Sequence, residues 1–204
     1  MDKLKQCPAE DMKEVIIHTV LKARLDTVFD YLVRQDPKKE EAFKNKIGHM
    51  DIARVLQFLG CKPSKSEVKM IIWEVDDDLD GYVNLEEYYM MYKRCTTDTE
   101  NKEPRKLFNL VQFLMYDKEF KGSVTVEETL QILFVRHGRD RLDAEIRAIF
   151  GDDEDQKDAD GVERAIQYSE YLDKINARSL TEFKIKQELH FRKRLVVIDN
   201  GEDN

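Results

Sequence analysis

The sequence is poor in residues that interrupt helices, with 8 glycines and 4 prolines among its 204 residues. Because these two residues are the least favourable in the interior of a helix, their scarcity favours long helices. No apolar run approaches the roughly 20 residues that cross a bilayer, so no integral membrane segment is expected. Residues 1–14 are polar and charged, without the pattern of a secretory signal peptide. These absences predict a helical protein of the cytoplasm or cytoskeleton.

Cysteine is also scarce. Cys7, Cys61 and Cys95 form an odd set, without the CxxC spacing of metal or redox motifs. This predicts free thiols in a reducing compartment. Buried or idle thiols are the favoured interpretation, and a redox role for Cys61 or Cys95 is the alternative.

Positive charge is in the minority, since 34 lysines and arginines face 42 acidic residues and the net charge is −8. The acidic excess gathers at residues 76–87, 151–160 and 199–204. This balance argues against non-specific binding to nucleic acid. The four histidines are scattered, and the sequence has no Gly-rich phosphate loop, nucleophile elbow or Cys–His constellation. We therefore expect a binding or structural protein rather than an enzyme.

One segment, residues 76–87, reads DDDLDGYVNLEE and has an oxygen donor at every position that a twelve-residue calcium-binding loop needs. In such an EF-hand loop the donors stand at positions 1, 3, 5, 7, 9 and 12, and glycine at position 6 allows the sharp turn. The predicted ligands are the side chains of Asp76, Asp78, Asp80, Asn84 and Glu87 and the backbone carbonyl of Tyr82. The alternative is an acidic surface loop that happens to contain a glycine. The full ligand set favours one site for Ca²⁺, with Mg²⁺ as a second candidate ion.

The segments around this loop have the periodicity of amphipathic helices. In the first, apolar residues recur at spacings of three and four from Ile17 to Leu32. Predicted helices cover residues 9–33, 52–59, 64–75, 85–94, 104–114, 125–137, 141–150, 168–175 and 179–197. Ser64 or Ser66 is the expected cap of the third helix, and the polar segment 96–104 is the expected linker between two halves.

The segment 59–91 resembles the second EF-hand of calmodulin and its relatives. It shares with them a leucine–glycine before the hand, a following proline, the apolar pattern of the entering helix and a Glu–aromatic–x–Met–Met exit. These features lie at Leu59, Gly60, Pro63, Glu67, Val68, Ile71, Ile72, Val75, Asp76, Glu87, Tyr88, Met90 and Met91. The resemblance extends, more weakly, over residues 20–176. It implies an all-α fold with two lobes of paired EF-hands, an extended N-terminal helix and an extra C-terminal helix.

The implied domains are an N-terminal helix (1–35), a first lobe (36–95), a linker (96–104), a degenerate second lobe (105–176) and a C-terminal helix with an acidic tail (177–204). A lone helix–loop–helix cannot bury its apolar face, so each hand should pair with a neighbour through a short strand contact. The residues at the eighth loop positions are Ile47, Val83, Val124 and Ile166.

The third loop, residues 117–128, departs from the ligand pattern. Glu119 stands at position 3, and Lys121 at position 5 puts an ammonium group where the metal needs an oxygen. Calcium binding by this loop is left open beside a purely structural role.

The first and fourth loops depart further. Asp51 takes the twelfth position of a first loop that is overlong and rich in lysine, and we expect no metal there. Glu170 takes the twelfth position of the fourth, but the preceding region 151–164 is too long for a standard loop. A solvated acidic insertion is the favoured interpretation, with loose cation binding as the alternative.

Three runs, at residues 73–82, 107–117 and 150–153, resemble the small EF-hand subunits of outer dynein arm docking complexes. That resemblance implies a cilium or flagellum and a place in an axonemal assembly.

Two hypotheses for function follow. The first is a calcium-sensing adaptor subunit that grips helical segments of a protein partner, and the second is a constitutive structural subunit that calcium does not switch. The last predicted helix is basic and amphipathic, which suits an acidic partner, a membrane surface or a microtubule wall as well as simple packing on the second lobe. Its basic residues are Lys184, Lys186, Arg192, Lys193 and Arg194.

Overall fold

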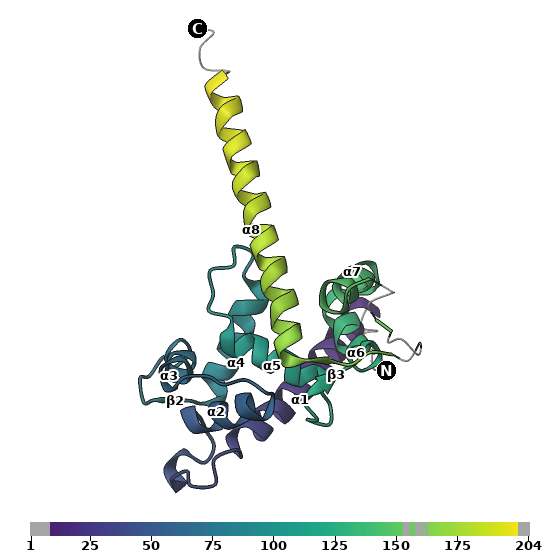
Figure 1. Cartoon of the computed structure of the whole chain (residues 1–204). Coiled ribbons are helices and arrows are strands. Elements are labelled where there is room, and N and C mark those ends of the chain that lie inside the picture. The colour runs from purple at the N-terminus through teal and green to yellow at the C-terminus, as the bar shows by residue number, and fades with distance from the viewer. Residues whose placement is uncertain (1–8, 153–155, 158–160, 162, 200–204) are drawn as a thin grey trace, which may run out of the picture.

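The computed structural model describes residues 9–152, 156–157, 161 and 163–199, and these are almost entirely helical (Figure 1). The helices are α1 (Ala9–Val33), α2 (His49–Phe58), α3 (Lys65–Trp73), α4 (Leu85–Thr97), α5 (Lys106–Tyr116), α6 (Val126–His137), α7 (Arg139–Phe150) and α8 (Tyr168–Asp199), with a short 3-10 turn at Glu41–Phe43. The strands are β1 (Ile47–Gly48), β2 (Tyr82–Val83), β3 (Ser123–Val124) and β4 (Ile166–Gln167). The predicted all-α fold class is confirmed.

Short antiparallel strand pairs join the loops two by two. Ile47 pairs with Val83 in β1–β2, and Val124 pairs with Ile166 in β3–β4. All four side chains are buried, so each contact also closes the core beneath its pair of loops. The eighth-position residues therefore meet as expected. We call the four helix–loop–helix units the first (α1–α2), second (α3–α4), third (α5–α6) and fourth (α7–α8) hands.

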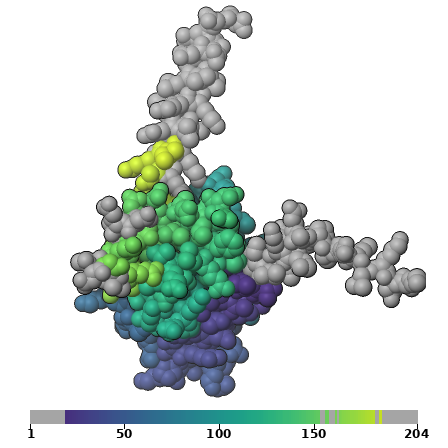
Figure 2. Space-filling view, turned by 90° about the vertical axis from the view of Figure 1, so that its right-hand side faces the viewer, coloured from purple at the N-terminus to yellow at the C-terminus, as the bar shows by residue number. Residues whose placement is uncertain are grey.

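The two lobes share one hydrophobic core and form one body (Figure 2). Helix α1 bridges them because it packs on α2 of its own lobe and on α5 and α6 of the other. The rings of Tyr31 and Phe120 stack at 3.9 Å across the junction. The long N-terminal helix thus lies between the lobes rather than standing apart from them.

The C-terminal helix differs from its prediction. Instead of two helices at 168–175 and 179–197, α8 runs unbroken from Tyr168 to Asp199 and extends away from the body (Figure 1). The residues at the expected break, 176–178, include no glycine or proline, so nothing in the backbone ends the helix there. The domain boundary expected at 177 therefore falls inside a helix.

Smaller differences concern helix ends. Helix α2 begins at His49, three residues before the prediction, because Asp51 Oδ2 accepts the N–H of Gly48 at 2.7 Å and holds the first turn. Helix α4 continues to Thr97, so the segment between the lobes begins at Asp98. Ser64, rather than Ser66, caps α3: its Oγ accepts the N–H of Glu67, whose carboxylate accepts the N–H of Ser64.

Candidate metal centre

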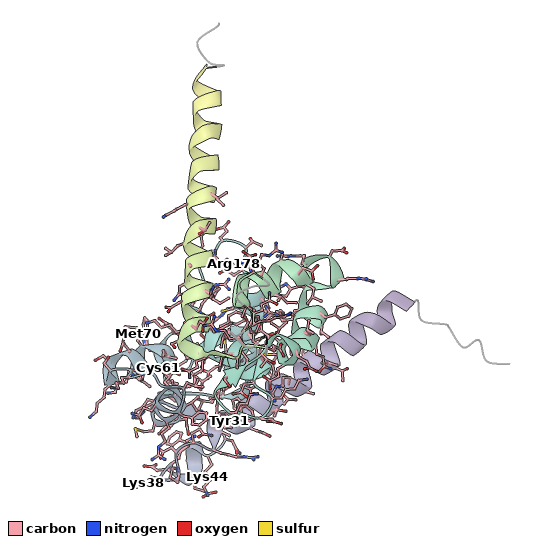
Figure 3. All side chains as sticks on the ribbon, turned by 45° about the vertical axis from the view of Figure 1, so that its right-hand side comes forward. Tyr31, Lys38, Lys44, Cys61, Met70 and Arg178 are labelled. Atoms are coloured by element: carbon pink, nitrogen blue, oxygen red, sulfur yellow. The ribbon has the colours of Figure 1, made fainter. Side chains whose placement is uncertain are left out.

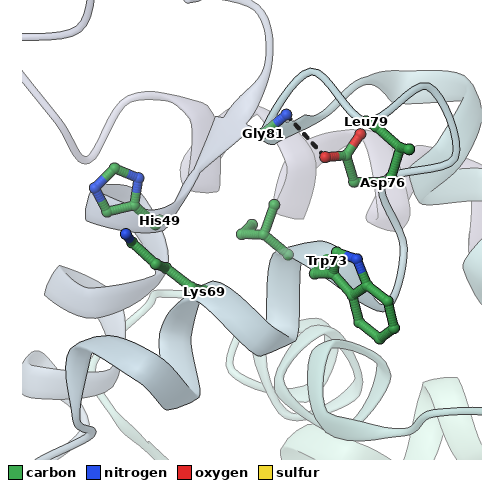
Figure 4. A pocket seen from close by; sticks show the side chains of 7 residues that line it. His49, Lys69, Trp73, Asp76, Leu79 and Gly81 are labelled. Carbon is green, nitrogen blue, oxygen red and sulfur yellow. Dashed lines mark hydrogen bonds between the residues drawn. The ribbon is translucent and has the colours of Figure 1, made fainter.

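The second loop has the backbone of a sharp turn. Gly81 has φ of +85° with open space where a side chain would begin, so the backbone angle and not crowding calls for glycine. The N–H of Gly81 donates to Asp76 Oδ2 at 2.8 Å (Figure 4). The N–H of Asp80 donates to Asp76 Oδ1 at 3.1 Å. Asp76, three residues after the end of α3, is thus the buried residue around which the loop folds.

Three of the predicted ligands converge. One carboxylate oxygen from each of Asp76, Asp78 and Asp80 lies within 4.8 Å of the other two. Asp76 is 6% exposed, while Asp78 and Asp80 face solvent, so the cluster is anchored on one side and open on the other. Clustered carboxylates repel one another, and a hard cation that prefers oxygen ligands relieves this repulsion.

Glu87 closes the loop from α4. Its Oε1 accepts the N–H groups of Asp77 at 3.0 Å and Asp78 at 3.2 Å, and its Oε2 accepts the N–H of Asn84 at 2.9 Å. Glu87 is only 6% exposed, and among the described residues no lysine or arginine forms an ion pair with its carboxylate, although the Lys46 charge is near enough to act on it electrostatically. The twelfth-position carboxylate therefore lies beside the start of the loop, where the metal-binding pattern needs it.

The remaining two predicted ligands are placed by secondary structure. Asn84 caps α4, since its Oδ1 accepts the N–H groups of Glu86 and Glu87 at 2.9 and 3.0 Å. Tyr82 lies in β2, and its ring stacks on Phe43 of the first loop at 4.1 Å. The loop thus offers hard oxygen donors throughout, and these fit Ca²⁺ or Mg²⁺.

One residue near these carboxylates was missed from the sequence. The Lys46 ammonium, from the first loop, forms a hydrogen-bonded ion pair with Asp80 and lies 3.9 Å from Asp78. The hydrogen bond to Asp80 raises the pKa of Lys46. The pairing of Ile47 with Val83 was the signal that could have revealed it, because it brings residue 46 beside the second loop.

In the first loop, a lysine holds the twelfth-position carboxylate. Lys39 Nζ lies 2.5 Å from Asp51 Oδ2 and also donates to the carbonyls of Val33 at 2.8 Å and Lys46 at 2.7 Å. The Lys39 and Asp51 side chains are 4% and 0% exposed. The ammonium is therefore enclosed by three oxygen atoms of its own hand, as a bound cation would be.

The third and fourth loops repeat this arrangement nearer the surface. Lys121 Nζ lies 2.6 Å from Glu128 Oε1, and Arg164 lies 2.8 Å from Glu170. Burial by itself raises the pKa of Glu128, but the hydrogen bond and the charge of Lys121 outweigh it, and the pKa is lowered. In each of these loops a basic side chain of the same loop holds the carboxylate that would otherwise complete a metal site.

A pocket of about 350 Å³ lies beside the second loop (Figure 4). It is lined by His49, Lys69, Ile72, Trp73, Asp76, Leu79 and Gly81. Trp73 and Leu79 are 65% and 72% exposed, so an apolar surface adjoins the carboxylate cluster.

Several expected features lie elsewhere or outside the described residues. Cys61 and Cys95 are free thiols, and burial raises the pKa of Cys95 to about 11, which disfavours the reactive thiolate. Cys7, the acidic tail and part of the acidic region 151–164 are outside the described residues, as are the side chains of Lys186, Arg192, Lys193 and Arg194.

Among the described helices, none is long and apolar enough to cross a membrane.

Comparison with known proteins supports the loop geometry. Residues 45–95 match a family model described as an EF-hand domain pair. The chain is 30% identical over 88 residues to the probable calcium-binding protein CML27 of Arabidopsis thaliana, covering 43% of this chain and 47% of that protein. It is 32% identical over 88 residues to the calcium-binding allergen Ole e 8 of Olea europaea (43% and 51%), and 29% identical over 101 residues to the polcalcin Cup a 4 of Hesperocyparis arizonica (46% and 56%).

The matches span about half the length of these curated relatives. Together with the helical fold and the paired loops, they show an EF-hand domain pair at residues 45–95 in a chain that is similar to calcium-binding proteins. The relatives that the chain resembles are calcium-binding proteins, and the match to the EF-hand pair model covers the first of its two pairs of loops.

Proposed function

We propose that the chain binds one Ca²⁺ in the second loop, through Asp76, Asp78, Asp80, the Tyr82 carbonyl, Asn84 and Glu87. The observation that carries this proposal is the convergence of three carboxylates within 4.8 Å, with Glu87 bonded to the start of the same loop. Ca²⁺ takes six to eight such oxygens in a flexible geometry. Mg²⁺ competes less well, because it demands a tighter octahedral shell and gives up its waters reluctantly.

The contrast among the twelfth positions supports a single site. Asp51, Glu128 and Glu170 each pair with a lysine or arginine of their own loop, whereas among the described residues the hydrogen bonds to the Glu87 carboxylate come from backbone N–H groups. A metal entering one of the paired loops has to displace a tethered cation at close range, which costs free energy. Within the part of the four loops that the structure describes, the second loop alone combines a full donor set with a twelfth carboxylate that is not in an ion pair.

Calorimetric titration of Ca²⁺ into the full chain, with Mg²⁺ present, tests this site. We expect one site of micromolar strength in the wild type and binding weaker by more than about tenfold in Glu87→Gln, which loses the bidentate carboxylate. Glu86→Gln is the matched control, because Glu86 is an exposed neighbour with the same charge. Two or more sites of similar strength would contradict the single-site proposal.

We further infer a role as an adaptor subunit whose grip on a protein partner depends on calcium. The apolar surface at Trp73 and Leu79 adjoins the loop, so metal binding changes its shape or exposure directly. A helical segment of a larger assembly is the kind of partner that EF-hand lobes take. The assembly that we propose is a ciliary or flagellar outer-arm docking complex on microtubules, and it is supported by the sequence resemblance at residues 73–82, 107–117 and 150–153.

A constitutive structural role is the second candidate, favoured by the internal cations and the shared core, which hold the fold without metal. Trp73 fluorescence and binding of an apolar dye, measured with and without Ca²⁺, separate the two roles. New apolar surface on loading supports the sensor. Unchanged dye binding with full metal occupancy supports the scaffold.

A further inference from the structure

The carboxylate cluster of the second loop already has a cationic partner, and that partner comes from the neighbouring hand. The Lys46 ammonium is bonded to Asp80 and lies 3.9 Å from Asp78. The Lys46 side chain is 27% exposed and that of Asp80 28%, so the pair is partly shielded from solvent. Two of the three convergent carboxylates thus share one tethered positive charge.

The backbone at Lys46 is held in place while its side chain can move. The next residue, Ile47, is buried and paired with Val83, and the Lys46 carbonyl accepts a bond from Lys39 Nζ at 2.7 Å. The Phe43–Tyr82 stack ties the same two loops together. Lys46 therefore stays within reach of the second loop whether or not its ammonium is bound there.

This arrangement differs from that of the other hands. Lys39, Lys121 and Arg164 hold the twelfth carboxylate of their own loops, where they substitute for a metal. Lys46 instead reaches the third- and fifth-position carboxylates of another loop and leaves Glu87 to its backbone partners. It can therefore compete with a metal without removing the site.

We propose that Lys46 is a built-in competitor of Ca²⁺, which lowers the affinity of the second loop and stabilises the lobe when it holds no metal. This inference rests on the proposed calcium site. Loading the loop moves the ammonium away from Asp78 and Asp80, because both carboxylates are needed as ligands. A residue of the first hand thereby sets the calcium concentration at which the second loop is filled.

The test compares the full-length wild type, Lys46→Gln and Lys44→Gln by calorimetric titration of Ca²⁺. Glutamine keeps a polar side chain of similar reach and removes the charge. Lys44→Gln is the matched control, because it removes the same charge from the same loop. The Lys44 side chain, labelled in Figure 3, pairs with Glu41 and is 57% exposed. We expect Lys46→Gln to bind Ca²⁺ about two- to fivefold more tightly, the range for a partly exposed ion pair. Lys44→Gln should match the wild type.

A second readout is thermal unfolding in excess chelator. Lys46→Gln should lower the Tm of the metal-free chain and enlarge the upward shift that Ca²⁺ produces. Unchanged or weaker calcium affinity in Lys46→Gln overturns the competition, as does an equal gain in Lys44→Gln, while the calcium site itself stands. Absence of calcium binding in all three proteins overturns both the site and the competition.

Discussion

At the scale of single residues, the twelfth position of each loop has its own partner. Glu87 accepts backbone N–H groups, whereas Asp51 holds the Lys39 ammonium at 2.5 Å in a fully buried pair. The oxygens around Lys39 make up part of a cation shell, which explains how a hand can keep its shape after losing its ligands. A basic residue in a degenerate loop therefore stabilises the hand, besides marking a position where an oxygen ligand is missing.

This pair gives a stability prediction. Lys39→Met leaves the Asp51 carboxylate buried without its cation, and we expect a loss of about 3–5 kcal/mol in the free energy of unfolding. Lys38→Met, at the exposed neighbouring position, should change it by less than about 0.5 kcal/mol. Urea unfolding of the metal-free proteins measures both. Equal stability of the two variants would show that the buried pair is not structural.

At the scale of elements, the contact between α7 and α8 explains why the start of α8 stays with the second lobe. Arg178 donates to Glu145 Oε2 at 2.7 Å and Oε1 at 3.1 Å, a bidentate pair (Figure 3). Glu145 also has Arg141 at 3.5 Å and His137 at 3.8 Å. Burial alone raises the pKa of Glu145, but the Arg178 hydrogen bond, the charge that His137 has when protonated, and the charges of Arg178 and Arg141 together lower it.

The pair predicts a loss of stability on substitution. Arg178→Met should lower the free energy of unfolding by about 1.5–3 kcal/mol, because Glu145 loses its best donor. Arg147→Met, which removes an exposed pair between α7 and Asp152 just beyond its end, should cost less than about 1 kcal/mol.

The same pair predicts a pH dependence. The pKa of Glu145 is lower in the folded chain than in the unfolded chain. The stability that the ionised carboxylate contributes is therefore fully present above the unfolded pKa of about 4.3, and it is lost as pH falls through the folded pKa. Unfolding curves between neutral and acid pH should therefore converge for wild type and Arg178→Met. A constant gap down to the lowest pH would contradict this.

At the scale of the whole molecule, Arg24 joins the lobes by capping a helix across their junction. Its guanidinium donates to the carbonyls of Leu114 at 2.6 Å, Met115 at 2.9 Å and Asp117 at 2.6 Å, at the C-terminal end of α5. The last carbonyls of a helix have no partner within the helix and attract cations. A residue of the first hand thus completes a helix of the third.

Arg24→Met should therefore destabilise the chain by about 3 kcal/mol, since several charge-assisted bonds are lost and the carbonyls stay partly buried. Arg34→Met, one residue beyond the end of the same helix and with a 76% exposed side chain, is the control and should be nearly neutral. Circular dichroism and Trp73 fluorescence, followed during urea unfolding, should give coincident transitions in the wild type, because both lobes share a core. Two separate wild-type transitions would contradict the shared core.

The local sequence pattern was sufficient to predict the helices, the paired strands and a loop with the ligand pattern of a calcium site. The spacing of apolar residues, the donor at each loop position and the glycine at the turn act over a few residues, so they can be read along the chain. The eighth-position contacts Ile47–Val83 and Val124–Ile166 followed from the same pattern. The unbroken α8 was missed because a helix end was expected where no residue ends it.

The placement of the cations was decided by tertiary structure. Nothing in the spacing of Lys39, Lys46 or Lys121 distinguishes a lysine that fills its own loop from one that reaches a neighbour. Strand pairing and burial decide this, because a long flexible side chain binds whichever carboxylate the fold brings near it. The capping of α5 by Arg24 has the same origin, since its partners lie some 90 residues away along the chain. Ligand type is thus a local property, whereas competition for a ligand depends on distances that only the packed chain sets.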